Sequence, residues 1–216
     1  TADTPTVVVH DGASPTDMGA AARVYWTLKS LGVEDLALLN GGYQAWANEG
    51  LSTATGRATP TKSDFNAEWR DDWYIPTSEV VKLVESGDAR LVDGRPKGFF
   101  EGTTWSIARP GTIHGAENLQ FAKFFENGLM VSPDRARAIA DAQGLQDAPV
   151  TVSFCNTGHW AAINWFALSE LAEVPNTRLY AASMAEYGTG DHALDNEPSR
   201  VTYLWLTTKR WVSGLF

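Results

Sequence analysis

Residues 150–162 read VTVSFCNTGHWAA, and this stretch decides the fold. The β-branched and apolar run 150–154 predicts a short buried strand that ends at Cys155. A loop of small and polar residues follows, and the apolar spacing over 161–171 predicts a helix. The amides of such a loop and the positive end of the helix both favour an anion, so this junction predicts a thiolate nucleophile at Cys155. The alternative is a buried cysteine that acts as a small hydrophobic residue.

A series of strands and helices surrounds this junction. The patterns predict a helix over 77–85 that Thr77 caps, a strand over 90–93, a helix from Pro133 to about Gln143 opened by Ser132, and a last strand over 178–181. Alternating strands and helices indicate an α/β fold with a parallel sheet.

An earlier, shorter series has the same alternation. We expect a buried strand over 6–10, a helix over 18–31, a strand over 36–39 and a helix over 43–48. Residues 51–72 are rich in Thr, Ser, Ala and Asp without a sustained period, which predicts a linker. The two series form a weak internal repeat, because each has a β-branched strand, a loop of small residues and a helix with Ala and Trp.

The composition excludes several classes of protein. The 216 residues are 44% hydrophobic, which is enough for a core, and carry a net charge of −9, which disfavours nucleic-acid binding. No apolar run approaches the roughly 18 residues of a membrane span. The single cysteine excludes an internal disulfide and a multi-cysteine zinc site, and Cys155 with His159 does not make a metal site alone. The aromatic tail 201–216, which ends at Phe216, is expected to dock on the body.

Residues 155–160 (CNTGHW) resemble the six-residue active-site loop of the rhodanese sulfurtransferases. Other stretches resemble this family in the family's order: 91–95 (LVDGR) its D-x-R element, 110–118 (PGTIHGAEN) its P-G-H-I-P-G-A-x-N signature, and 180–187 (YAASMAEY) its Y-D-G-S-W-x-E-W ending. In the first series, 7–11 (VVVHD), 20–26 (AAARVYW) and 39–46 (LNGGYQAW) resemble a second copy, with Asp11 where an active domain has cysteine.

The resemblance implies a tandem arrangement. Residues 73–200 correspond to a catalytic rhodanese-like domain with a central parallel sheet flanked by helices, and 1–50 to the C-terminal half of an inactive rhodanese-like domain. Residues 51–72 link them, and the tail 201–216 follows. Because half a domain exposes apolar faces and strand edges, we expect a separate polypeptide to complete it. The resemblance also implies the periplasm, with the cytoplasm as the alternative.

The resemblance implies sulfur transfer without a metal or organic cofactor. Cys155 is the expected catalytic residue, which carries sulfane sulfur as a persulfide from a small anionic donor, such as thiosulfate or 3-mercaptopyruvate, to cyanide or a thiol. The expected substrate-binding residues are Asn156, Thr157, Gly158, His159, Trp160 and Arg95. A persulfide carrier without turnover is the alternative. A cysteine phosphatase is disfavoured, because its loop ends in arginine where this chain has Ala161.

Several roles stay open at this stage. Arg95 either supplies charge to the site or forms an internal brace with Asp93. His159 either orients an acceptor or helps to stabilise the thiolate, or it points to solvent. Trp160 is either a pocket wall or an anchor of the loop, and His114 is expected to make a structural hydrogen bond.

The donor stays open as well. Asn156 and Thr157 are neutral where members that use thiosulfate often have basic residues, and Phe99 stands where some members have a second arginine.

Overall fold

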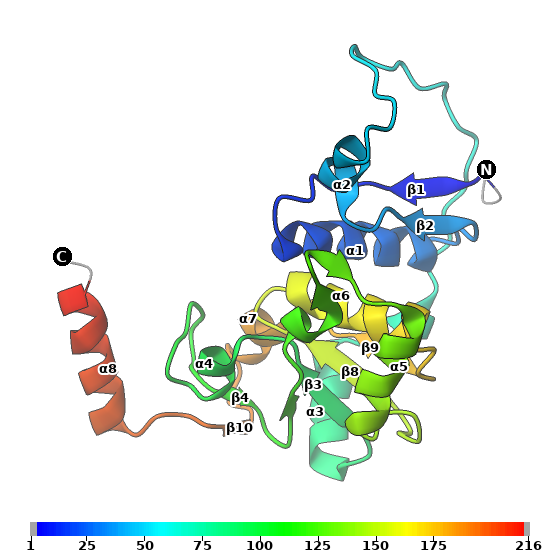
Figure 1. The fold of residues 1–216 in the computed structure, drawn as a ribbon. Helices are drawn as coiled ribbons and strands as arrows, with labels where there is room; N and C mark the ends of the chain where they lie inside the picture. The colour runs from blue at the N-terminus through cyan, green and yellow to red at the C-terminus, as the bar shows by residue number, and fades with distance from the viewer. Residues whose placement is uncertain (1–3, 214–216) are drawn as a thin grey trace.

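The computed structural model describes residues 4–213, and its centre is a four-stranded sheet whose strands are all parallel (Figure 1). Their order in space is β5 (Glu117–Asn118), β3 (Arg90–Asp93), β8 (Thr151–Phe154) and β9 (Thr177–Leu179). All four residues of β8 are buried, as expected for a strand with neighbours on both sides. The expected parallel sheet is confirmed, although β9 is shorter than the predicted 178–181.

Helices cover both faces of this sheet. They are α3 (Thr77–Ser86), the 3₁₀ segment η2 (Phe121–Phe124), α5 (Pro133–Ala142), α6 (His159–Phe166) with its π-helical continuation η3 (Ala167–Leu171), and α7 (Ser183–Tyr187), while the short helix α4 (Lys97–Phe100) follows β3 to one side of the sheet. Two antiparallel strand pairs flank them: β4 (Thr112–Ile113) with β10 (Leu194–Asp195), and β6 (Phe125–Glu126) with β7 (Leu129–Met130).

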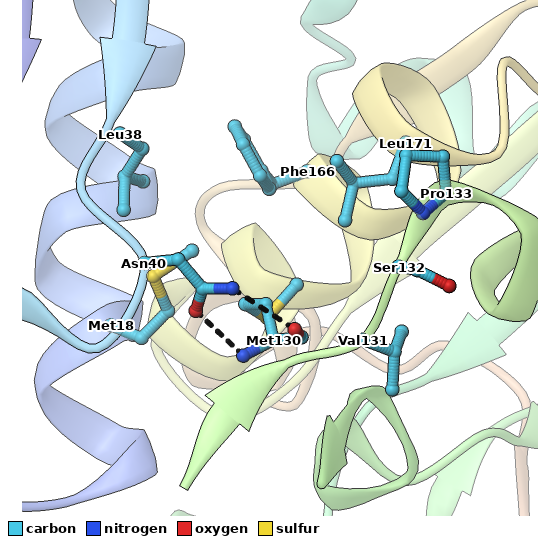
Figure 2. A pocket seen from close by; sticks show the side chains of 9 residues that line it. All are labelled: Met18, Leu38, Asn40, Met130, Val131, Ser132, Pro133, Phe166 and Leu171. Atoms are coloured by element: carbon cyan, nitrogen blue, oxygen red, sulfur yellow. Dashed lines mark hydrogen bonds between the residues drawn. The ribbon is translucent and has the colours of Figure 1, made fainter.

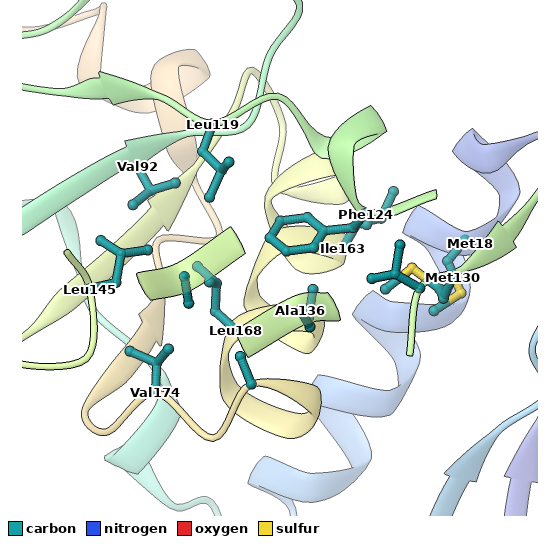
Figure 3. Packing of buried hydrophobic residues seen from close by; sticks show 14 residues of the cluster. Met18, Val92, Leu119, Phe124, Met130, Ala136, Leu145, Ile163, Leu168 and Val174 are labelled. Carbon is teal, nitrogen blue, oxygen red and sulfur yellow. The ribbon is translucent and has the colours of Figure 1, made fainter. Parts of the chain in front are cut away.

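Each face of the sheet has its own apolar cluster. Val92 packs with Phe124, Ile163 and Leu168 in the cluster of η2, α5, α6 and η3 (Figure 3). Its neighbour Leu91 belongs to the opposite cluster, with side chains of α3 and α7. Successive side chains of a strand point to opposite faces, so β3 contributes to both clusters.

The predicted cap of α3 is wrong. Pro76 is the N-cap residue and Thr77 is the first residue of the helix. The Thr77 hydroxyl instead bonds to the Tyr180 hydroxyl at 2.7 Å and to the Glu186 carboxylate. These partners come from the β9–α7 region, which the local sequence around Thr77 does not show. Ser132, in contrast, caps α5 as expected and accepts a hydrogen bond from its first turn.

The first series forms β1 (Thr6–Val8), α1 (Pro15–Ser30), β2 (Leu36–Leu38) and α2 (Gly42–Asn48). β1 and β2 pair in parallel as a two-stranded sheet, with α1 against it (Figure 1). The prediction of a buried strand over 6–10 is wrong: the strand ends at Val8, and Val7 and Val9 are 57% and 53% exposed. Two strands backed by one helix leave the other face of the pair open.

No helix or strand lies between residues 51 and 70. The 3₁₀ turn η1 (Asp71–Trp73) follows, and aromatic rings fix this end of the segment to α1. The rings of Trp26, Trp69 and Tyr74 pack on one another, and the Trp26 indole donates to the Trp73 carbonyl at 3.0 Å.

Helix α1 also packs directly on α6, and this contact joins the first series to the second. The buried residues of the contact are Ala22, Tyr25, Trp26, Ala161, Ala162 and Trp165. A Cβ on Gly19 would lie 3.0 Å from the His159 carbonyl oxygen, so glycine permits the close approach of α1 to the first turn of α6. Burial of Tyr25 and Trp26 stabilises the contact by about 2–3 kcal/mol each.

The tail forms helix α8 (Arg200–Ser213), which stands away from the body (Figure 1). Tyr203 stacks on Trp105 at 4.9 Å, but Leu204, Trp205 and Trp211 are 66%, 59% and 67% exposed. The expectation of a docked tail is therefore wrong for these side chains, because α8 faces no element of the body along this surface. Phe216 lies outside the described residues. Of the helices within 4–213, none combines the length and apolarity needed to cross a bilayer.

Candidate functional site

Cys155 lies where β8 ends and the loop to α6 begins, and it is 1% exposed. The Gly158 amide donates a hydrogen bond to Cys155 Sγ at 3.1 Å. Gly158 has φ +87°, and a Cβ there would lie 2.3 Å from Arg23 Nη1 and 2.4 Å from the Ala181 carbonyl oxygen. Only glycine fits this position, and its conformation turns the amide toward the sulfur.

A serine from α7 holds the backbone of Cys155. The Cys155 amide donates to Ser183 Oγ at 3.1 Å, and the Ser183 hydroxyl donates to the Tyr180 carbonyl at 2.8 Å. The Met184 amide donates to the Cys155 carbonyl at 3.1 Å. Ser183 itself has φ +55°. The sequence did not single out Ser183, although it lies in the stretch 180–187 that resembles the family ending.

Arg95 forms a buried brace, which is one of the two roles that the sequence left open. Asp93 and Arg95 are 0% and 1% exposed, and their side chains pair at 2.6 Å. Arg95 Nη1 donates to Asn156 Oδ1 at 3.0 Å, and Nη2 also donates to the Gly111 carbonyl at 2.7 Å. Thr112 Oγ1 donates to the same Asp93 carboxylate at 2.8 Å. Every nitrogen of the guanidinium makes a hydrogen bond within the protein, and the substrate contact predicted for Arg95 stays a prediction.

The Asn156 side chain belongs to this brace as well. Its oxygen accepts from Arg95, and its Nδ2 donates to Ser106 Oγ at 3.2 Å. Asn156 is buried, and the Ala185 amide donates to its carbonyl at 2.9 Å. The loop after Cys155 is therefore held from β3 on one side and from α7 on the other.

The side chains of the other predicted loop residues, Thr157, His159 and Trp160, do not belong to the brace of Asp93 and Arg95. Thr157 and His159 are exposed, and Thr157 Oγ1 lies 3.5 Å from His159 Nδ1. Trp160 stacks on Phe121 at 5.1 Å and meets Phe99 edge-on at 6.1 Å. Trp160 is thus an anchor of the loop, and Phe99 is part of that anchor.

Arg23 of α1 reaches the same loop, a contact that no motif in the sequence indicates. Its Nη1 donates to the Ala181 carbonyl at 3.4 Å, and its guanidinium lies over the Trp26 ring at 5.1 Å. Partial burial holds the pKa of Arg23 below its ordinary value, while the negative charge that Cys155 can carry acts in the opposite direction. A positive charge from the first series therefore lies beside the cysteine of the second.

His114 makes the structural hydrogen bond that the sequence predicts. Its Nδ1 lies 2.8 Å from Asp195 Oδ1, and the Gly115 amide donates to Asp195 Oδ2 at 2.8 Å. Burial alone would raise the pKa of Asp195, but these hydrogen bonds hold it below its ordinary value. The contact joins β4 to β10, not to the Cys155 loop.

A cavity of about 380 Å³ lies elsewhere, between the first series and β7, α5 and η3 (Figure 2). Its lining is mostly apolar: Met18, Leu38, Asn40, Met130, Val131, Ser132, Pro133, Phe166 and Leu171. The Asn40 amide pairs with the backbone of Met130 through hydrogen bonds of 3.0 and 2.7 Å. Because no titratable side chain lines it, this cavity does not compete with Cys155 as the reactive site. No set of three or more potential metal ligands occurs within residues 4–213.

Comparisons with known proteins point to one group. No model of a known protein family matches the chain. The 3-mercaptopyruvate sulfurtransferase of Escherichia coli K12 is 30% identical over 187 residues, which are 84% of this chain and 64% of that protein. The human 3-mercaptopyruvate sulfurtransferase is also 30% identical over 187 residues, which are 84% of this chain and 62% of that protein.

The fold of this chain is also similar to that of a solved structure from the same group of enzymes. The crystal structure of a 3-mercaptopyruvate sulfotransferase from Escherichia coli, described as a rhodanese fold, matches with a TM-score of 0.72 and 27% identity over 85% of this chain and 68% of that chain. The chain spans less than two thirds of the length of the two curated relatives.

Proposed function

The chain belongs to the rhodanese family, and on this premise we propose that it is a sulfurtransferase that carries sulfane sulfur as a persulfide on Cys155. The observation that supports the proposal most is the Gly158 amide 3.1 Å from Cys155 Sγ. A hydrogen bond from a fixed amide stabilises negative charge on the sulfur, both in the thiolate and in the persulfide.

The transfer takes two steps. With thiosulfate as donor, the Cys155 thiolate attacks the outer sulfur, the S–S bond of thiosulfate breaks, and sulfite leaves with the electron pair. The product is a Cys155 persulfide anion. Cyanide then attacks the outer sulfur of the persulfide, thiocyanate leaves, and the thiolate is regenerated. With 3-mercaptopyruvate the C–S bond breaks instead, and the thiol proton passes to the enolate that becomes pyruvate.

The surroundings of Cys155 suit a small donor and a fixed loop. The side chain is 1% exposed, so a compact anion fits the approach better than a bulky disulfide. Ser183 and Met184 hold the Cys155 backbone on one side, and Asn156 is held by Arg95 on the other. Fixed donors need no reorganisation as charge moves onto the sulfur, which is the condition for electrostatic stabilisation.

The test is intact mass spectrometry of the reduced chain after incubation with thiosulfate or, separately, 3-mercaptopyruvate. We expect a gain of one sulfur atom, its location on the peptide that contains Cys155, and its removal by cyanide with release of thiocyanate. Cys155→Ser serves as the matched control and is expected to fold but to gain no sulfur. Sulfur on the Cys155→Ser variant, or none on the native chain with either donor, would refute the proposal.

The same experiment separates the two functions that the sequence left open. A persulfide that forms and is turned over by cyanide identifies an enzyme. A persulfide that forms but is released neither to cyanide nor to a small thiol identifies a carrier within a larger assembly. The exposed apolar side chains of β1 and α8 are the surfaces that favour this second function.

We also propose that residues 1–50 are part of a second rhodanese-like unit of a tandem protein, and that another polypeptide segment pairs with the β1–β2 sheet. The support is the β1–α1–β2–α2 order and the exposure of Val7 and Val9. An isolated two-stranded sheet is marginally stable in water. Hydrogen exchange on the protein isolated from its source, compared with this chain alone, tests this. Stronger protection of residues 6–8 in the natural protein supports the pairing, and equal exchange refutes it.

A further inference from the structure

The two arginines around Cys155, Arg95 and Arg23, differ in how fully their guanidinium N–H groups are hydrogen-bonded within the protein. Each guanidinium has five N–H donors. Each nitrogen of Arg95 donates within the protein, to Asp93, Asn156 or the Gly111 carbonyl, and the residue is 1% exposed. The guanidinium of Arg23, within the part of the chain that the structure describes, makes a single long hydrogen bond of 3.4 Å, and the residue is only partly buried.

Arg23 is also placed over the active-site loop. Its Nη1 occupies the space beside the Gly158 Cα, 2.3 Å from where a Cβ would be. Gly158 is the residue whose amide binds Cys155 Sγ. The guanidinium and the sulfur are therefore separated by one loop residue. The close packing of Gly19 on the His159 carbonyl and the burial of Trp26 fix the part of α1 that carries Arg23.

Apart from His159, the loop 155–160 has no side chain that can carry a positive charge. Asn156 and Thr157 are neutral, and Trp160 packs on the rings of Phe99 and Phe121. Both expected donors are anions, and with thiosulfate the leaving sulfite carries two negative charges. Besides His159, the cationic side chains near Cys155 are therefore the buried Arg95 and the partly buried Arg23.

We propose that Arg23 binds the anionic group of the sulfur donor and holds it beside Cys155. This rests on the proposed sulfur transfer, and it makes the first series a contributor to substrate binding. A planar guanidinium can donate two parallel hydrogen bonds to a sulfonate-like or carboxylate oxygen pair, which suits both thiosulfate and 3-mercaptopyruvate.

The first test needs no sulfur transfer. Iodoacetate and iodoacetamide alkylate the same thiolate, but only iodoacetate is an anion, so the ratio of their rates at Cys155 reports local positive charge. We expect Arg23→Met to lower this ratio at least about threefold, and Arg23→Lys to keep most of it. Lys29→Met removes a cation from the same helix and is the matched control, with an unchanged ratio. Thermal unfolding of all three variants excludes a loss of fold.

The second test uses turnover. Arg23→Met is expected to raise KM for thiosulfate on the order of ten- to a hundredfold, the usual effect of losing a hydrogen bond to a charged group, with a smaller effect for Arg23→Lys. An unchanged alkylation ratio and an unchanged KM in folded Arg23→Met would overturn the role of Arg23. A chain that forms no persulfide but shows the lowered ratio refutes the sulfur transfer and keeps Arg23 as an anion-binding residue.

Discussion

Removing the charge of Asp93 from its buried ion pair with Arg95 should strongly destabilise the fold. Asp93→Asn keeps the shape of the side chain and removes its charge. Arg95 then carries an uncompensated charge at 1% exposure, and its hydrogen bonds to Asn156 and Gly111 do not neutralise it. Loss of one partner of a buried pair costs about 3–5 kcal/mol. For a chain of this length we expect the Tm to fall by about 6–20 °C.

The assay is thermal and guanidinium unfolding followed by circular dichroism, with Asp134→Asn as the control. Asp134 forms an ion pair with Arg137 in which its side chain is 95% exposed, so its loss should change stability by less than about 1 kcal/mol. The double variant Asp93→Leu with Arg95→Met should cost less than the sum of the single changes, because it removes the unpaired charge.

The same hydrogen bonds of Arg95 also position the loop that follows Cys155. When Arg95 loses Asp93 it no longer holds the Asn156 side chain in place, so we expect slower persulfide formation in Asp93→Asn even at temperatures where the fold persists. A variant whose unfolding free energy stays within about 1 kcal/mol of the native chain would refute this reasoning, since a buried charge cannot lose its partner at so small a cost.

Two further changes test other parts of the structure. Gly158→Ala places a Cβ against Arg23 and the Ala181 carbonyl at φ +87°, so we expect a loss of about 1–3 kcal/mol in urea unfolding and a large loss of persulfide formation; native stability would contradict the close approach. Burial, opposed by the hydrogen bond to Thr77, raises the pKa of Tyr180 to about 12. This contribution to stability is full below the unfolded pKa near 10 and is lost as the pH rises toward 12. The free energy of unfolding should therefore fall less steeply with rising alkaline pH in Tyr180→Phe than in the native chain; equal slopes in the two would contradict this.

The local motif was sufficient to predict the strand, loop and helix around Cys155. The apolar run before the cysteine and the Ala-rich segment after it each have one dominant pattern, and both elements formed where expected. The hydrogen bond from the Gly158 amide to the Cys155 sulfur also agrees with the local sequence, because a glycine in such a loop indicates backbone amides that point inward. These features depend on residues close together in the chain.

The errors arise where the partner is distant. Thr77 is a good cap by its local sequence, but Tyr180 and Glu186 compete for its hydroxyl. Trp205 and Trp211 are apolar enough to dock, yet composition does not say whether the body offers a surface to receive them. Val7 and Val9 have a strand pattern, but burial on both faces requires elements that composition cannot place.

The same reasoning explains why Arg23 could not be found from the active-site motif. Arg23 and Gly158 are far apart in the chain, and they meet because α1 packs on α6 through small residues, with Gly19 against the His159 carbonyl. A helix that approaches the first turn of another so closely also brings its longer side chains over the loop that precedes that turn. The packing that stabilises the contact between the two series is therefore also what places a cation beside Cys155, so stability and anion binding at this site depend on the same helix pair.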